Sequence, residues 1–408
     1  MRIYAFQGIR YSDHDAAGSW AGPPYDQIDD DLQSQLHQEP QHFAHLIRPA
    51  GATGEAHQAA TELHRQWLNK KVLTRERGPA LYPYEIRLAK GGRRLGICAL
   101  VGLEDADSGI IRPHEATVAK TVDERLSLLR NMRIDLEPIL MLADDQGDLD
   151  RLLEEDLQGS QPLVRHEDAD GNHHRLYLLE DTARISVYQQ TLSHSVGLIA
   201  DGHHRYTVAS KYAAESHAET GSSAAAKLAV ITGLSAPGLQ IDPIHRRLER
   251  PLDLESVAHR ASSCRPIADP SGVQIAAVVA AASQPSIGVS FGGRTELWSF
   301  DPERSPASLP EHLRHLSVGW LHDVLLPEMS LDSAAATDGT VGYRSDPDRL
   351  HRELQEGSAA MGFWLPPMSG ESFASAMQGG SLLPPKSTRF LPKVASGLVW
   401  VGHDATVA

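Results

Sequence analysis

An apolar segment that ends in an Asp-Gly turn and continues into a cationic helix start is the most constraining feature of this chain. Val196–Ala200 predicts a buried strand, Asp201 and Gly202 predict a turn, and a helix is expected over about 207–214, opened by the His-His-Arg run at 203–205. A helix dipole is positive at its start, so each cation there costs about 0.3–1 kcal/mol. The run therefore works against local helix preference.

A bound anion would remove this conflict. Free N–H groups at the helix start, the dipole and the Arg205 guanidinium could together hold a phosphate or a carboxylate. We expect Gly202, His203, His204 and Arg205 to contact that anion, and Asp201 to orient the turn or contact a metal. The alternative is an ordinary surface helix that Asp201 caps.

Composition and charge narrow the class of protein. The 408 residues allow two or three domains, and the net charge of −15 argues against a general nucleic-acid binder, which would carry a basic face. The two cysteines cannot build a disulfide framework. Without a signal peptide or an apolar run of about 20 residues, we expect a soluble, cytoplasmic protein that binds no membrane.

The order of predicted elements favours a mixed α/β fold of the α+β class. Strands and helices alternate without a strict βαβ rhythm. A capping-box pattern at Thr121–Glu124 predicts a helix over about 122–133. A composition shift near Arg250 suggests two domains, 1–249 with the anion site and 250–408 as a smaller mixed α/β domain.

A second candidate site is the segment Arg112–Thr117, which a strand precedes and the predicted helix follows. Glu115 is our candidate general base, with His114 in support. Phosphoryl transfer needs such a base together with positive charge, which Arg112, Lys120 and Arg125 would supply. Each of these residues could instead be structural.

Three further segments could contribute to an anion site. Pro384–Thr388 offers Lys386, Ser387 and Thr388 in a proline-bounded loop, although no P-loop glycines precede it. His245 and Arg246 are predicted to follow a strand end, and Pro23–Asp26 could hold Asp26 in place. A surface loop or a rigid turn is the alternative at each position.

No dedicated metal site is expected, despite 21 histidines. Neighbouring helical residues point about 100° apart, so His203 and His204 cannot easily share one ion, and no His-Glu-x-x-His pattern occurs. Mg²⁺ that arrives with a nucleotide and uses one or two carboxylates is easier to accommodate.

Taken together, the motifs resemble domain-of-unknown-function family 1015 of bacteria and archaea. They are Pro-Pro-Tyr-Asp at 23–26, Pro-His-Glu-x-Thr at 113–117, Asp-Glu-Arg-Leu at 123–126, Ala-Asp-Gly-His-His-Arg-Tyr at 200–206, His-Arg at 245–246 and Pro-Lys-Ser-Thr at 385–388. The resemblance runs from about Tyr4 to Val399. Thr207 stands where the family commonly has an acidic residue, and a proline precedes the His-Glu pair, which weakens the charge pattern there.

The Asp-Gly-His-His-Arg turn is also similar to the signature of the ParB/sulfiredoxin superfamily, which includes free serine kinases and CTP-binding ParB proteins. That resemblance implies a ParB/sulfiredoxin-like core in which the turn cradles nucleotide phosphates. Sulfiredoxin has a reactive cysteine where His203 stands here, so thiol chemistry is not expected. A DNA-binding module of the ParB type is not visible.

The sequence thus predicts a phosphotransferase that uses a nucleotide (ADP, ATP or CTP) with Mg²⁺ and phosphorylates a small hydroxylated metabolite, serine being the leading candidate. A phosphatase acting on a phosphorylated metabolite and a non-enzymatic nucleotide-binding switch remain alternatives. The oligomeric state stays open.

Overall fold

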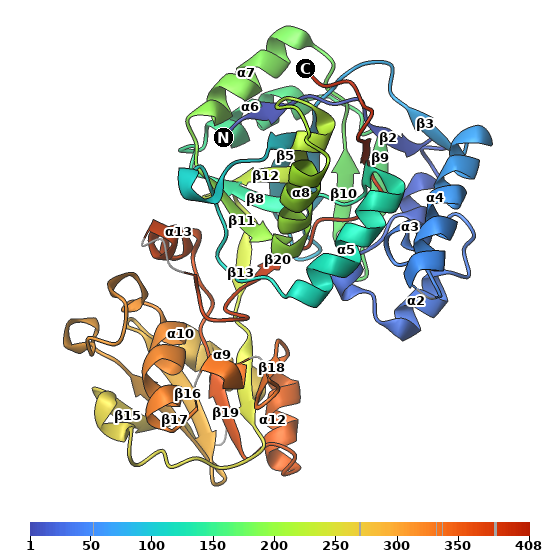
Figure 1. Ribbon diagram of the computed structural model, residues 1–408. Coiled ribbons are helices and arrows are strands. Elements are labelled where there is room, and N and C mark those ends of the chain that lie inside the picture. Colours follow the sequence, from blue (N-terminus) through green and yellow to red (C-terminus); the bar gives the residue numbers. More distant parts are fainter. Residues whose placement is uncertain (52, 269–270, 332, 337, 379–381) are drawn as a thin grey trace. The chain divides into compact units, whose positions relative to one another are not determined.

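The computed structural model describes residues 1–51, 53–268, 271–331, 333–336, 338–378 and 382–408. The chain forms two compact units: unit 1 comprises Met1–Leu239 and Pro392–Ala408, and unit 2 comprises Gln240–Leu391 (Figure 1). The sequence placed all of 250–408 in the second domain, whereas residues 392–408 return to unit 1. There β21 (Val401–Gly402) pairs with β7 (Ile134–Asp135), which fixes the returning segment.

Unit 1 contains a nine-stranded mixed sheet, which confirms the expected mixed α/β class. Its strands follow the order β6 (Ile111–Arg112), β11 (Gly197–Asp201), β8 (Ile139–Ala143), β12 (Ala226–Gly233), β5 (Arg93–Gly102), β4 (Tyr82–Arg87), β10 (His173–Leu176) and β9 (Val164–Glu167), and β1 (Ile3–Tyr4) also pairs with β5. The pairs β6/β11 and β8/β12 are parallel, and the other pairs are antiparallel. A separate ribbon joins β2 (Ile9–Tyr11) to β3 (Leu73–Arg75).

Unit 1 also contains helices, and several of them pack on this sheet. The helices are α1 (Ala17–Trp20), α2 (Asp30–Leu36), α3 (Ala44–Ile47), α4 (Thr53–Asn69), α5 (Ala119–Met132), α6 (Asp148–Leu157), α7 (Thr182–Ser193) and α8 (His203–Glu215), with 3-10 turns at Tyr25–Gln27, Ala106–Ser108 and Ser223–Ala225. Leu153 of α6 and Tyr188 of α7 are fully buried with the aliphatic residues of β5, β8 and β12. Burial of these apolar side chains supplies the main stabilisation of the unit.

Helices α5 and α8 lie side by side (Figure 1) and pack through a small apolar cluster. Val122 and Leu126 of α5 contact Val208 and Tyr212 of α8, the i, i+4 spacing that puts two residues on one helix face. The expected capping box at Thr121 does not form, because α5 begins at Ala119 with Val118 as its N-cap. The entry into the helix is fixed instead by bonds to α8 that are described below.

Unit 2 is built on a six-stranded antiparallel sheet. Its strands follow the order β15 (Ser263–Pro266), β17 (Arg294–Ser299), β16 (Ser286–Phe291), β19 (Met361–Trp364), β14 (His245–Leu248) and β18 (Val341–Arg344), and β13 (Gln240–Asp242) pairs separately with β20 (Arg389–Leu391). The helices are α9 (Gly272–Ala280), α10 (Ser317–Gly319), a π-helical turn at Trp320–Leu325, α11 (Leu326–Glu328), α12 (Pro347–Gln355) and α13 (Gly370–Gln378). Four 3-10 turns lie at Ala258–Arg260, Pro302–Arg304, Glu311–Leu313 and Ser333–Ala336. The core of unit 2 includes the buried side chains of Trp364, Ile275 and Leu350. Across the described parts of both units, every helix is too short or too polar to cross a bilayer.

A buried ion pair between Lys227 and Asp135 joins β12 to β7. Lys227 is 2% exposed, and its Nζ donates to the Asp135 carboxylate and, at 2.8 Å, to the carbonyl of Glu137. The second oxygen of Asp135 accepts the Leu228 peptide N–H at 2.8 Å. Removing either charge would leave the other buried without compensation.

We therefore predict that Lys227→Met lowers the free energy of unfolding by about 3–5 kcal/mol, the usual cost of breaking a buried pair from one side. Urea denaturation followed by circular dichroism measures this loss. The control is Lys211→Met, because Lys211 is half exposed and 3.9 Å from Asp123; it should cost less than about 1 kcal/mol. A similar small effect for both variants would contradict the prediction.

Candidate functional site

The candidate site begins where β11 enters α8. The helix starts at His203, so the His-His-Arg run opens it as expected, and its N-cap is Gly202 with φ 98°. A Cβ at Gly202 would lie 2.5 Å from Ile139 Cγ2, so both the conformation and the space require glycine. The first helical hydrogen bond runs from the Tyr206 N–H to the Gly202 carbonyl, so the preceding N–H groups lie at the open, positive end of the helix.

The loop 113–118 is hydrogen-bonded directly to this helix start. The His114 peptide N–H donates to His203 Nε2 at 3.2 Å, and the Val118 N–H donates to His204 Nε2 at 2.9 Å. The imidazoles of His114 and His203 meet edge to face, with 4.3 Å between ring centroids. The first two predicted motifs, far apart in the sequence, thus lie against each other.

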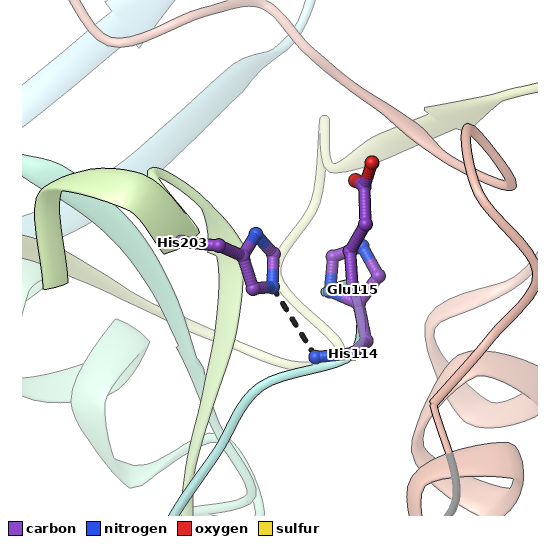
Figure 2. A group of neighbouring side chains, drawn as sticks. All are labelled: His114, Glu115 and His203. Atoms are coloured by element: carbon purple, nitrogen blue, oxygen red, sulfur yellow. Dashed lines mark hydrogen bonds between the residues drawn. The ribbon is translucent and has the colours of Figure 1, made fainter. Parts of the chain in front are cut away.

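Two buried imidazoles and one carboxylate gather at this junction (Figure 2). His114 Nδ1 lies 2.7 Å from the Ile199 carbonyl, which can only accept, so Nδ1 carries the proton. Burial lowers the pKa of His114 and lowers the pKa of His203 well below its usual value, so both rings are neutral near pH 7. Glu115 is half-buried, and one ligand atom from each of His114, Glu115 and His203 lies within 4.8 Å of the other two.

Asp201 and Arg205 form an internal ion pair behind the helix start. Arg205 Nη2 donates to Asp201 Oδ2 at 2.7 Å, and its Nη1 donates to the Pro138 carbonyl at 2.6 Å. The other oxygen of Asp201 accepts from Lys393 Nζ. Burial alone would raise the pKa of Asp201, but Lys393 and Arg205 outweigh it and hold the pKa below its usual range.

This arrangement changes the expected roles of both residues. Arg205 is 8% exposed and already holds internal partners, so its direct contact with a phosphate would require an exchange of the Asp201 pair. Asp201 does not cap α8, because the N-cap is Gly202 and no side chain caps the helix. The pair instead fixes the turn that the helix start depends on.

The other cations expected in unit 1 occupy different settings. Lys120 is exposed in the first turn of α5, and Arg112 donates from Nε to the Gly109 carbonyl at 3.0 Å. Arg125 is buried, donates to the Ile47 carbonyl at 2.6 Å and stacks 4.2 Å above the ring of Tyr25. Lys120 is therefore better placed than Arg125 to meet a ligand from solvent.

The Pro23–Asp26 segment packs against α5 through Tyr25, whose ring contacts Arg125. Tyr25 donates its peptide N–H to Glu137 Oε1 at 3.0 Å, and Asp26 is exposed. Burial alone would lower the pKa of Arg205, but the carboxylates of Glu137, Asp201 and Asp26 outweigh burial and raise it. The negative charges around Arg205 therefore keep it protonated.

In unit 2 the structure differs from the expectation for His245 and Arg246. They follow the end of β13, as expected, but they are not in a loop: both lie within β14, 1% and 0% exposed, where the chain enters the sheet between β18 and β19. His245 Nδ1 accepts the Leu365 N–H at 3.2 Å, and Arg246 Nη2 donates to the Pro385 carbonyl at 3.1 Å. These two residues are therefore core groups of unit 2.

The Arg246–Pro385 bond also joins two predicted motifs within unit 2. In the loop that it holds, Ser387 donates to the Pro384 carbonyl, Lys386 is exposed with φ 56°, and Thr388 is half-buried. Ser387 lines a cavity of about 310 Å³ within unit 2. Contact of Lys386, Ser387 and Thr388 with a ligand at α8 stays a prediction.

Sequence reasoning missed Lys393 as a partner of the Asp-Gly turn. Its charge next to Pro392 was visible, but the sequence placed it in the second domain, whereas its Nζ binds Asp201 of unit 1. The sequence also does not reveal the His114–Glu115–His203 group. Its second imidazole comes from a distant loop and not from a neighbouring residue of the same helix.

The family of this chain follows from a model of the family described as "Protein of unknown function (DUF1015)", which matches residues 3–315. The match covers most of the sequence, and the chain belongs to this family. No curated protein matches the sequence.

Several solved structures are distantly similar. A conserved hypothetical protein from Pyrococcus furiosus has 12% identity and a TM-score of 0.36 over 75% of this chain and 96% of its own. A free serine kinase in complex with AMP has 15% identity and a TM-score of 0.35 over 74% and 92%, and SbnI from Staphylococcus aureus has 13% and 0.38 over 73% and 84%. Similarity at this level assigns no activity, so the functional argument rests on the site.

The charge of Asp201 leads to a pH prediction. Because its pKa is depressed in the folded protein, its stabilisation is complete above the unfolded pKa of about 3.9 and is lost as the pH falls toward the lower folded value. We expect Asp201→Asn to cost about 3 kcal/mol at pH 7 and progressively less below about pH 4. Urea denaturation across this range measures the difference.

Asp148→Asn is the matched control, because Asp148 pairs with Arg151 while both side chains are 60% exposed. This variant should cost less than about 1 kcal/mol. A loss for Asp201→Asn that grows as the pH falls would contradict the assigned direction.

Proposed function

We propose that this protein is a phosphotransferase that moves a phosphoryl group from a nucleotide bound with Mg²⁺ to a small hydroxylated metabolite, with serine as the leading acceptor. The observation that carries the proposal is the junction between loop 113–118 and the start of α8. It puts the Glu115 carboxylate beside the positive end of a helix. A base and a phosphate-binding helix start are the two parts that this reaction needs.

The helix start is suited to a phosphate. The first N–H groups of a helix have no partner within the helix, and together with the dipole they attract an anion. Gly202 and His204 at this end are half-buried. Lys393, whose side chain is 18% exposed, and the exposed Lys120 at the start of α5 carry positive charge in this region. This local charge offsets the overall net charge of −15, which would otherwise repel a nucleotide.

Glu115 serves as the general base. The acceptor hydroxyl gives its proton to the Glu115 carboxylate while its oxygen forms a bond to phosphorus and the terminal P–O bond of the nucleotide breaks. The bound nucleotide supplies the phosphoryl group. His114 acts as a positioning residue, because its bond to the Ile199 carbonyl anchors the loop that carries Glu115 to β11.

In this proposal Arg205 holds Asp201 in place and does not contact the phosphate directly. The Arg205–Asp201–Lys393 chain holds the turn at Gly202 and sets the direction of the helix start. Asp201 keeps Lys393 close to that end of the helix. The chain is thus a support for the anion site.

We predict that Glu115→Gln abolishes phosphoryl transfer while nucleotide affinity changes less than about threefold, because the amide keeps the shape but cannot take a proton. The assay incubates ATP, ADP or CTP and Mg²⁺ with serine and follows phosphoserine, and calorimetry measures the nucleotide affinity. The control is Glu219→Gln, an exposed glutamate outside the site, which should retain full activity.

The same assay separates the alternatives. Steady phosphate release from phosphoserine without nucleotide would point to a phosphatase. Tight nucleotide binding without transfer to any hydroxylated metabolite would point to a binding switch. Full activity in Glu115→Gln would exclude Glu115 as the base.

A further inference from the structure

We propose that His114, Glu115 and His203 form a binding site for a zinc-class divalent cation, in addition to the nucleotide site. The three side chains come from two segments, the loop after β6 and the first residue of α8, and Figure 2 shows the His203 ring facing the His114–Glu115 segment. This inference does not rest on the proposed function, because it concerns what the three side chains bind in the absence of any nucleotide.

The donor set selects the class of ion. Two imidazoles and one carboxylate are the ligands of many catalytic zinc sites, which leave a position for water or substrate. Mg²⁺ prefers an all-oxygen octahedral shell and binds such a set weakly. The group thus favours Zn²⁺ or Co²⁺ over the Mg²⁺ that accompanies a nucleotide.

The distances are compatible with one ion. Ligand bonds of about 2.0–2.1 Å in a tetrahedral zinc site put the ligand atoms about 3.3 Å apart. The three ligand atoms here lie within 4.8 Å of one another. Where these atoms lie farther apart than in a zinc site, the half-buried Glu115, with its rotatable side chain, can contribute to their approach.

The surroundings of His114 match those of a metal ligand. Its Nδ1–H donates to the Ile199 carbonyl at 2.7 Å, which fixes the ring orientation and assigns Nε2 as the nitrogen that would coordinate. Metal-bound histidines almost always donate their other ring N–H in this way. Both His114 and His203 are also buried, which limits competition from water.

His203 would contribute one ring nitrogen. Its Nε2 accepts the His114 peptide N–H at 3.2 Å, so an ion held by this imidazole would bind at the cost of that hydrogen bond. Glu115 would bind through one carboxylate oxygen.

The test is cobalt spectroscopy on the full-length, metal-stripped protein without nucleotide. We expect Co²⁺ to bind at one equivalent per chain with visible d–d bands of a four- or five-coordinate site, and Zn²⁺ but not Mg²⁺ to displace it. Glu115→Gln and His203→Gln should each weaken Co²⁺ binding about tenfold or more. His173→Gln, a change at a half-exposed histidine on β10, should leave the affinity unchanged.

Thermal unfolding of each metal-free variant checks that the fold is retained, and Glu115→Gln is the more conservative of the two. Absence of the bands, equal displacement by Mg²⁺, or unchanged affinity in a folded Glu115→Gln variant would overturn the site. None of these outcomes depends on phosphoryl transfer, so failure of the metal site and failure of the proposed function are distinguishable.

Discussion

Two hydrogen bonds from the loop 113–118 to the first turn of α8 organise the site. The peptide N–H groups of His114 and Val118 donate to the imidazoles of His203 and His204. In a partly buried setting such bonds are costly to leave unmade, because each N–H would lose water without gaining a partner. They explain why two histidines stand at a helix start that disfavours cations: both rings act as neutral acceptors there.

Behind these bonds, a chain of charges fixes the turn. Arg205 binds Asp201 and the Pro138 carbonyl, and Lys393 binds the other oxygen of Asp201. Removing a single member leaves an uncompensated charge in a largely buried place. In the proposed function, rigidity of the turn would keep the helix start and the Glu115 carboxylate at a fixed separation.

The sequence predicted the local parts of this site better than their assembly. The strand before Gly202 and the mixed α/β class followed from the apolar pattern, whereas the role of the His114–Glu115 pair stays a prediction. The start of α5 was wrong by three residues, because the partner of Val118 is His204 on a different helix and not a local cap. No periodicity in the sequence carries that information.

The unexpected settings of Arg205, His245 and Arg246 share one cause. A sequence shows that a cation is present but not whether it faces solvent or an internal partner, and here Arg205 faces Asp201 while Arg246 faces the Pro385 carbonyl. Likewise, Lys393 could be assigned to the Asp201 turn only once the path of residues 392–408 was known. Long-range pairing decided each of these outcomes.

Docking of phosphates at the start of α8 is tested most directly by hydrogen–deuterium exchange with and without a saturating nucleotide and Mg²⁺. If phosphates dock at the start of α8, peptides covering 199–206 and 113–118 should gain protection together, because the loop and the helix start are hydrogen-bonded. Nucleotide binding that protects other segments and leaves both of these unchanged would contradict the account.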